Sequence, residues 1–119
     1  YKGYSLEKDT IEMAEKCAYK VDNLRLFYDE NDKMNLKLDK ETQEILVVSQ
    51  FTLYADASNN NRPSFTKAAK GSVAEPIYLH FVESLKKLGH KVQTGVFGAH
   101  MIINAEYTGP LNLLYEIGE

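Results

Sequence analysis

The most apolar stretch of the chain lies near its middle, at residues 45–48, where four aliphatic side chains follow one another. A short continuous run of this kind is typical of a buried central strand. The next five residues mix polar and apolar side chains: Ser49, Gln50, Phe51, Thr52 and Leu53. We expect the strand to end in them and to carry a site, since binding sites commonly form where strands end. The polar loop of residues 55–63 follows and carries one cation, Arg62.

Residues 10–23 form a predicted helix. Their apolar side chains recur at steps of three and four residues, the period of a helix with one buried stripe. Asp9 and Glu12 have the spacing of a capping box at its start. Cys17 lies within the stripe, so we expect a small buried side chain rather than a reactive thiol.

A second predicted helix follows Ser72. Glu75 lies three residues after this cap, and Pro76 falls in the first turn, where its missing N–H removes no hydrogen bond. The apolar stripe continues over residues 77–88. Gly89 then stands where helices commonly end.

Other segments have the composition of strands. They are residues 24–27, 34–38, 91–96, 100–107 and 111–117. The last two flank a turn at Gly109 and Pro110 and would form a hairpin. With the central strand, these elements predict one α/β domain over residues 1–119. Its sheet would be mixed and largely antiparallel, with two main helices packed on it.

The composition limits the class of protein. The chain has 119 residues, of which 14 are basic and 17 acidic, so its net charge is −3 at pH 7. This balance argues against a surface that wraps a nucleic-acid backbone by bulk charge, but it allows a local contact to a nucleic-acid end. A single cysteine favours a reducing compartment. No apolar run is long enough to span a bilayer, so we expect a cytoplasmic protein without a membrane partner.

The spacing of the histidines gives little support for acid–base or nucleophilic catalysis by side chains. The histidines are His80, His90 and His100. Their spacing gives no reason to place one beside Ser49 or Thr52, and it lacks the pairing of a zinc-binding helix. We therefore expect no metal catalyst, and a Gly-rich phosphate loop is also absent from the sequence. A strand end rich in backbone donors and hydroxyls suits binding and main-chain stabilisation of an oxyanion.

Four short motifs occur in order along the chain. They are SQFTL at residues 49–53, RPSF at 62–65, GVFGAHM at 95–101 and the dipeptide of Gly109 and Pro110. In this order and spacing they resemble the D-aminoacyl-tRNA deacylases, first called D-tyrosyl-tRNA deacylases. The similarity spans nearly the whole chain. It implies a homodimer without metal or cofactor that hydrolyses the ester joining a D-amino acid, or glycine, to the terminal adenosine of tRNA, as chiral proofreading in translation.

The resemblance implies a catalytic centre in the first motif. Its residues would be Ser49, Gln50, Phe51 and Thr52. Gln50 would help to hold the site, and backbone N–H groups near Phe51 and Thr52 would bind the carbonyl oxygen as charge develops. Thr52 is the natural candidate for a nucleophile. We favour attack by water assisted by the ribose hydroxyl of the substrate, because the sequence offers no base for Thr52.

The resemblance also implies a set of substrate-binding residues. These are Leu53, Arg62, Phe97, Gly98, Ala99, Met101, Gly109 and Pro110. Phe97 and Met101 would flank the adenine. Gly109 and Pro110 resemble a Gly–cis-Pro pair that enters the site of the partner subunit, where a rigid wall would reject an L side chain. Arg62 would contact a tRNA phosphate or remain a solvated loop cation.

The chain departs from the family pattern in two places. The motif around the Gly-Pro pair is usually Asn-x-Gly-Pro-x-Thr, whereas Tyr107 and Asn112 stand at the flanking positions here. The opening pair of strands of the family has no counterpart ahead of Tyr1, which would leave a sheet edge open to association. The alternative to an enzyme is therefore a catalytically weakened relative that binds tRNA ends or DNA as a non-enzymatic module.

Overall fold

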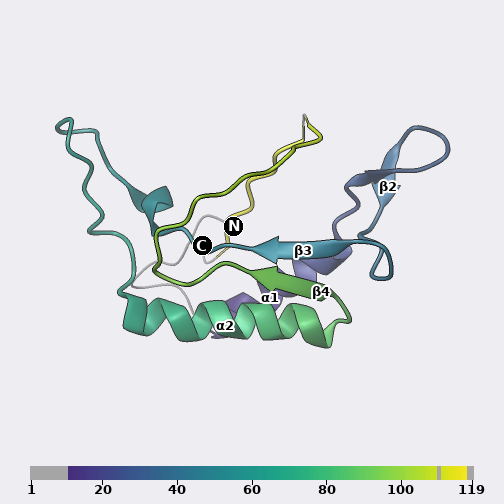
Figure 1. Cartoon of the computed structure of the whole chain (residues 1–119), viewed down its shortest axis with the longest axis horizontal. Helices are drawn as coiled ribbons and strands as arrows, with labels where there is room; N and C mark the ends of the chain where they lie inside the picture. The colour runs from purple at the N-terminus through teal and green to yellow at the C-terminus, as the bar shows by residue number, and fades with distance from the viewer. Residues whose placement is uncertain (1–10, 110, 118–119) are drawn as a thin grey trace.

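The computed structural model describes residues 11–109 and 111–117, so Asp9 and Pro110 lie outside the described residues. In chain order its elements are α1 (Ile11–Asn23), β1 (Phe27–Tyr28), β2 (Met34–Leu36), β3 (Glu44–Val47), the 3-10 helix η1 (Phe51–Tyr54), α2 (Gly71–Lys87) and β4 (Lys91–Thr94) (Figure 1). Two main helices with small sheets make a mixed α/β fold, as the sequence predicts.

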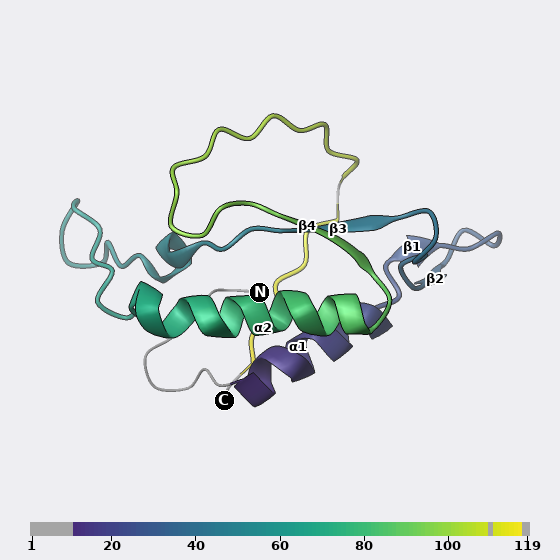
Figure 2. The same cartoon turned by 60° about the horizontal axis from the view of Figure 1, so that its bottom comes forward.

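The core lies on the inner faces of the two helices. From α1 it receives small side chains, which are Ala14, Cys17 and Ala18. From α2 it receives Ala74, Ile77, Tyr78, Val82 and Leu85. Figure 2 shows α2 between α1 and the β3–β4 pair, so α2 is covered on two sides. Cys17 is 1% exposed, which confirms the expected buried side chain, and this burial raises the pKa of its thiol to about 11.

The strands β3 and β4 pair in parallel, with Val47 opposite Thr94. Between them α2 is the crossover that returns the chain in the same direction. A separate antiparallel pair joins β1 and β2, with Phe27 opposite Leu36. The prediction of one largely antiparallel sheet is therefore wrong for the described residues. The direction of β4 depends on the length of α2, which carries the chain back to the start of β3 before β4 begins.

The predicted central strand is shorter than expected. β3 ends at Val47, Gln50 is still extended at φ −150° and ψ 97°, and the chain then coils into η1. The strand was expected to end within residues 49–53, but its pairing stops slightly earlier, at Val47, because the segment after β4 no longer pairs with it there. The Gly95 N–H donates to the Val47 carbonyl at 3.2 Å, and a turn closed by Ala99 N–H and Val96 O at 3.1 Å follows directly.

Two more predicted strands are wrong in the described part of the chain. Residues 100–109 and 111–117 have no strand, so the hairpin around Gly109 is not formed there. Their apolar side chains are largely exposed, Ile102 to 94% and Leu114 to 68%. An alternating pattern produces a strand only where a neighbouring strand and a covering layer are present.

The helix ends agree with the sequence in part. Lys70, not Ser72, occupies the N-cap position of α2, and its side chain makes no capping hydrogen bond. The predicted cap is therefore wrong by two residues. Gly89 has φ +100°, a left-handed conformation that suits glycine, and confirms the predicted end of the helix.

Candidate functional site

A cavity of about 760 Å³ opens between the end of β3, one face of α2 and the segment after β4. Nine of the predicted site residues line it: Ser49, Gln50, Phe51, Thr52, Leu53, Phe97, Gly98, Ala99 and Met101. They meet because β3 and β4 run in parallel, so the segments that follow both strands leave the sheet on the same side (Figure 1). The first and third sequence motifs thus line one cavity.

One wall of the cavity is the turn into η1. Gln50 Nε2 donates a hydrogen bond to Thr52 Oγ1, so this hydroxyl oxygen faces an amide donor. Phe51 is 58% exposed, and its ring meets Phe65 edge-on with centroids 5.2 Å apart. The first N–H groups of a helical turn have no acceptor within the turn. Those near Phe51 and Thr52 are therefore suited to face a ligand.

Another part of the wall is the turn after β4. Gly98 has φ +76° at the third position of this turn, where glycine is favoured over residues with a side chain. The Phe97 ring packs against the Tyr78 ring of α2, with centroids 5.5 Å apart and planes inclined by 50°. The Tyr78 hydroxyl donates to the Val47 carbonyl at 3.4 Å. A buried tyrosine therefore joins both walls from beneath.

Several lining residues were not predicted from the sequence. They are Val47, Val48, Ala69, Gly71, Ala74, Tyr78, Phe81, His100 and Ile103. Most are apolar and cannot be told from core residues by their spacing. Among the lining residues of α2, Tyr78 carries the one available signal, a hydroxyl in an otherwise apolar helix stripe, since a buried tyrosine usually finds a hydrogen-bond partner.

Two of the described site residues that were predicted, Arg62 and Gly109, do not line this cavity. Arg62 lies in an exposed loop, where its backbone N–H donates to Asn60 Oδ1 at 2.9 Å. Gly109 is exposed, and its α-carbon faces open space. Pro110 lies outside the described residues. The predicted pairing of Gly109 and Pro110 with a partner subunit is not tested by a single chain.

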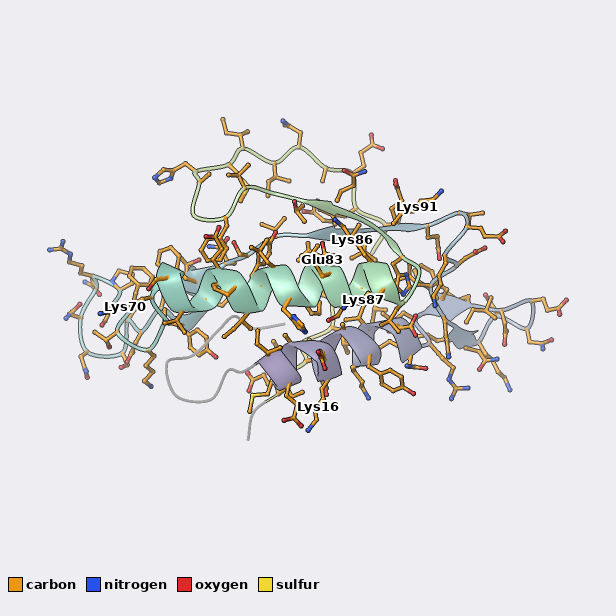
Figure 3. All side chains as sticks on the ribbon, turned by 90° about the horizontal axis from the view of Figure 1, so that it is seen from below. Lys16, Lys70, Glu83, Lys86, Lys87 and Lys91 are labelled. Atoms are coloured by element: carbon orange, nitrogen blue, oxygen red, sulfur yellow. The ribbon has the colours of Figure 1, made fainter. Side chains whose placement is uncertain are left out.

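The charges lie outside the cavity. Its described lining has no Lys, Arg, Asp or Glu. Figure 3 shows Lys86, Lys87 and Lys91 near the end of α2, far from Lys70 at the opposite end of that helix. Lys86 Nζ lies 3.6 Å from Glu83 Oε1. The described residues also hold no cluster of three or more potential metal ligands, and neither described helix has the length and apolarity needed to cross a membrane.

Comparisons with known proteins place the chain in a family. A family model described as "D-Tyr-tRNA(Tyr) deacylase" matches residues 5–116. The chain is 46% identical over 110 residues to the D-aminoacyl-tRNA deacylase of Clostridium perfringens, covering 92% of this chain and 74% of that protein. It is 48% identical over 108 residues to the D-aminoacyl-tRNA deacylase of Limosilactobacillus reuteri, covering 91% of this chain and 74% of that protein.

A solved structure is also similar. It is titled "c-Myc DNA Unwinding Element Binding Protein", superposes with a TM-score of 0.70 and shares 39% sequence identity. The match covers 82% of this chain and 66% of that one. With a family model spanning almost the whole sequence, and relatives this similar, the chain belongs to the D-Tyr-tRNA(Tyr) deacylase family.

Proposed function

We propose that this protein hydrolyses the ester of D-aminoacyl-tRNA and releases the free D-amino acid and tRNA. The observation that carries the proposal is the cavity shared by residues 49–53 and 97–101. The relatives that match this chain bear the name of this activity. The reaction would remove D-amino acids before they enter protein synthesis, so we expect the protein to act in the cytoplasm, beside translation.

In the proposed reaction, water attacks the carbonyl carbon of the ester beside residues 49–52. The bond from this carbon to the ribose oxygen breaks, and the ribose oxygen takes up a proton. Backbone N–H groups of Phe51 and Thr52 stabilise the charge that develops on the carbonyl oxygen. A ribose hydroxyl of the substrate assists the water, because the partner of Thr52 Oγ1 is the Gln50 amide rather than a base.

The uncharged cavity suits the terminal adenosine. Its volume of about 760 Å³ falls within the range of roughly 300–1,000 Å³ that is usual for small-molecule sites. Phe97 and Met101 contribute a ring and a thioether to its lining, and both are good surfaces for a flat base. We assign the adenine to these two side chains, with Gly98 and Ala99 beside it, and the amino acid to the side near Leu53.

Selectivity for the D ester is assigned to a second copy of the chain. Gly109 and Pro110 would enter the cavity of the partner subunit and exclude an L side chain by steric clash. The exposed apolar residues of the C-terminal segment support a homodimer, because large apolar surfaces are commonly covered in an assembly. They include Ile102, Ile103, Leu113 and Leu114. Arg62 is exposed in its loop and is proposed to contact a tRNA phosphate.

The test is to incubate the purified protein with D-tyrosyl-tRNA and, separately, with L-tyrosyl-tRNA. Loss of the D ester alone supports the proposal, and glycyl-tRNA as a third substrate shows whether glycine is accepted. Binding of tRNA without hydrolysis would instead support a non-enzymatic nucleic-acid-binding module. The similarity to a structure titled as a DNA-element binding protein gives that second candidate its support. A DNA duplex is therefore included as a binding competitor.

A further inference from the structure

We propose that Tyr78 and Gly95 are positioning residues, which set where Phe97 and Met101 stand in the cavity wall. The inference rests on the proposed function, since it takes these two side chains as the surfaces for the adenine. Gly95 does not line the cavity, and Tyr78, although part of the lining, is buried and packs against the Phe97 ring. Each acts through the side chain that it contacts.

Tyr78 holds Phe97 from the core side. It is only 4% exposed, so its ring is fixed by the packing of α2. One contact is the ring of Phe97, with centroids 5.5 Å apart. The other is a hydrogen bond from its hydroxyl to the carbonyl of Val47 at 3.4 Å, at the end of β3 and next to the first motif. Loss of the ring would let Phe97 tilt into the space beneath it.

Gly95 sets the place of Met101 by having no side chain. A Cβ atom built on Gly95 would lie 2.7 Å from Met101 Sδ and 3.3 Å from Met101 Cε. Both distances are shorter than ordinary carbon and sulfur contacts, so any side chain at this position must displace the thioether. The backbone of Gly95 is held by its N–H bond to Val47 O at 3.2 Å, and the flexible Met101 side chain is therefore the part that moves.

The experiment measures KM and kcat for D-tyrosyl-tRNA with Gly95→Ala and with Tyr78→Leu. We expect each variant to raise KM about fivefold or more with a smaller change in kcat, since stacking on the adenine is weakened. Tyr78→Phe keeps the ring and should stay within about twofold of the wild type. Tyr28→Phe and Gln93→Ala, at exposed positions of β1 and β4, are the matched controls.

Double variants separate positioning from a general loss of stability. Gly95→Ala should have no further effect on KM in a Met101→Ala background, and Tyr78→Leu none in a Phe97→Ala background, because the target of each is gone. The inference would be overturned if Gly95→Ala or Tyr78→Leu changed KM as much in its truncated background as in the wild type. An unchanged KM in the single variants would also overturn it. Urea unfolding of each variant verifies that it is folded at the assay temperature.

Binding of adenosine monophosphate to the same variants, followed by calorimetry, does not depend on hydrolysis. If the wild type fails to cleave D-tyrosyl-tRNA but binds this nucleotide, and Gly95→Ala weakens binding only when Met101 is present, the proposed reaction is wrong and the positioning role stands. If the wild type cleaves D-tyrosyl-tRNA, and the variants bind the nucleotide and cleave the ester as the wild type does, the proposed reaction stands and the positioning role is wrong.

Discussion

The side-chain amide of Gln50 donates a hydrogen bond to the hydroxyl oxygen of Thr52. The hydroxyl proton is thereby left to donate to a ligand, and nothing in this contact can remove it. We predict that Thr52→Ala remains active, with kcat/KM lowered by about tenfold or less, the loss expected for one neutral hydrogen bond. Single-turnover kinetics with D-tyrosyl-tRNA provide the measurement.

Thr52→Ser is the control, since it retains the hydroxyl and should stay near the wild-type rate. A fall of more than a thousandfold in Thr52→Ala, together with an acyl group found on Thr52 by mass spectrometry, would show a covalent mechanism.

Pro110→Ala tests the proposed source of chiral selectivity. A less rigid wall should admit the L side chain, so we expect L-tyrosyl-tRNA to be cleaved or activity toward both esters to fall. The ratio of the two cleavage rates is measured. Pro76→Ala, at an exposed position inside α2, is the control. An unchanged ratio in Pro110→Ala would remove this residue from the selectivity mechanism.

Leu85 is fully buried at 0% exposure, on the face of α2 that packs within the core. Leu85→Ala should lower the free energy of unfolding by about 2–5 kcal/mol, because it removes buried methyl groups and leaves a cavity. Urea denaturation measures the change. Leu79→Ala in the same helix is the control, since Leu79 is 51% exposed and should lose much less. Equal losses would contradict the packing of α2 described above.

Asp22 joins α1 to the start of β4 through His90. Its Oδ1 lies 2.7 Å from His90 Nε2 and 3.1 Å from Lys40 Nζ. Burial by itself raises the pKa of the Asp22 carboxyl, but the hydrogen bonds and positive charges of His90 and Lys40 outweigh it, and the pKa ends below its usual value of 3.8. The folded state therefore binds this proton less readily than the unfolded state does.

Because the pKa is lower in the folded state, the stabilisation by Asp22 is complete above the unfolded value and is lost as the pH falls through the folded one. We predict that the free energy of unfolding of the wild type falls below about pH 4 more steeply than that of Asp22→Asn. Urea titrations between pH 7 and pH 2.5 measure both slopes. Glu30→Gln, an exposed side chain before β2, is the control. Parallel slopes for wild type and Asp22→Asn would refute the linkage.

The thiol of Cys17 offers a simple probe of the helix interface. Since it is 1% exposed and its pKa is raised to about 11 by burial, we expect no reaction with a disulfide reagent at pH 8 while the protein is folded. Full reaction should follow in denaturing urea. Absorbance of the released thiolate reports both. Rapid, stoichiometric labelling of the native protein would mean that α1 separates readily from α2.

The helices could be predicted because their signals are local. An apolar stripe at helical spacing marked α1 and α2, and Gly89 ended the second helix as expected. The parallel direction of β4 could not be predicted in this way, because it depends on how far α2 carries the chain before it turns back. The segment after Val47 contains residues that are common in strands. Strand β3 nevertheless ends at Val47, because the segment that follows β4 stops pairing with it after Gly95, and only the folded structure shows this.

The site could be predicted where its residues form compact motifs. Residues 49–53 and 97–101 come together in the cavity as neighbours. Tyr78 was missed because a tyrosine in a helix stripe has the same spacing as any core residue, and its contact with Phe97 links positions that are distant in sequence. Arg62 and Gly109 lie apart from the described cavity, and Pro110 lies outside the described residues; the roles assigned to all three depend on tRNA or a second subunit.

The two ends of the loop that carries Arg62 lie side by side, because Asp56 and Ser64 exchange two backbone hydrogen bonds of 2.8 Å each. Because the loop is closed at its base by this pair, its length can change without displacing the segments on either side. Residues 57–63 can therefore be exchanged as a unit without moving η1 or α2. The position of the Arg62 side chain can thus change with the loop while the cavity at η1 and α2 stays unchanged.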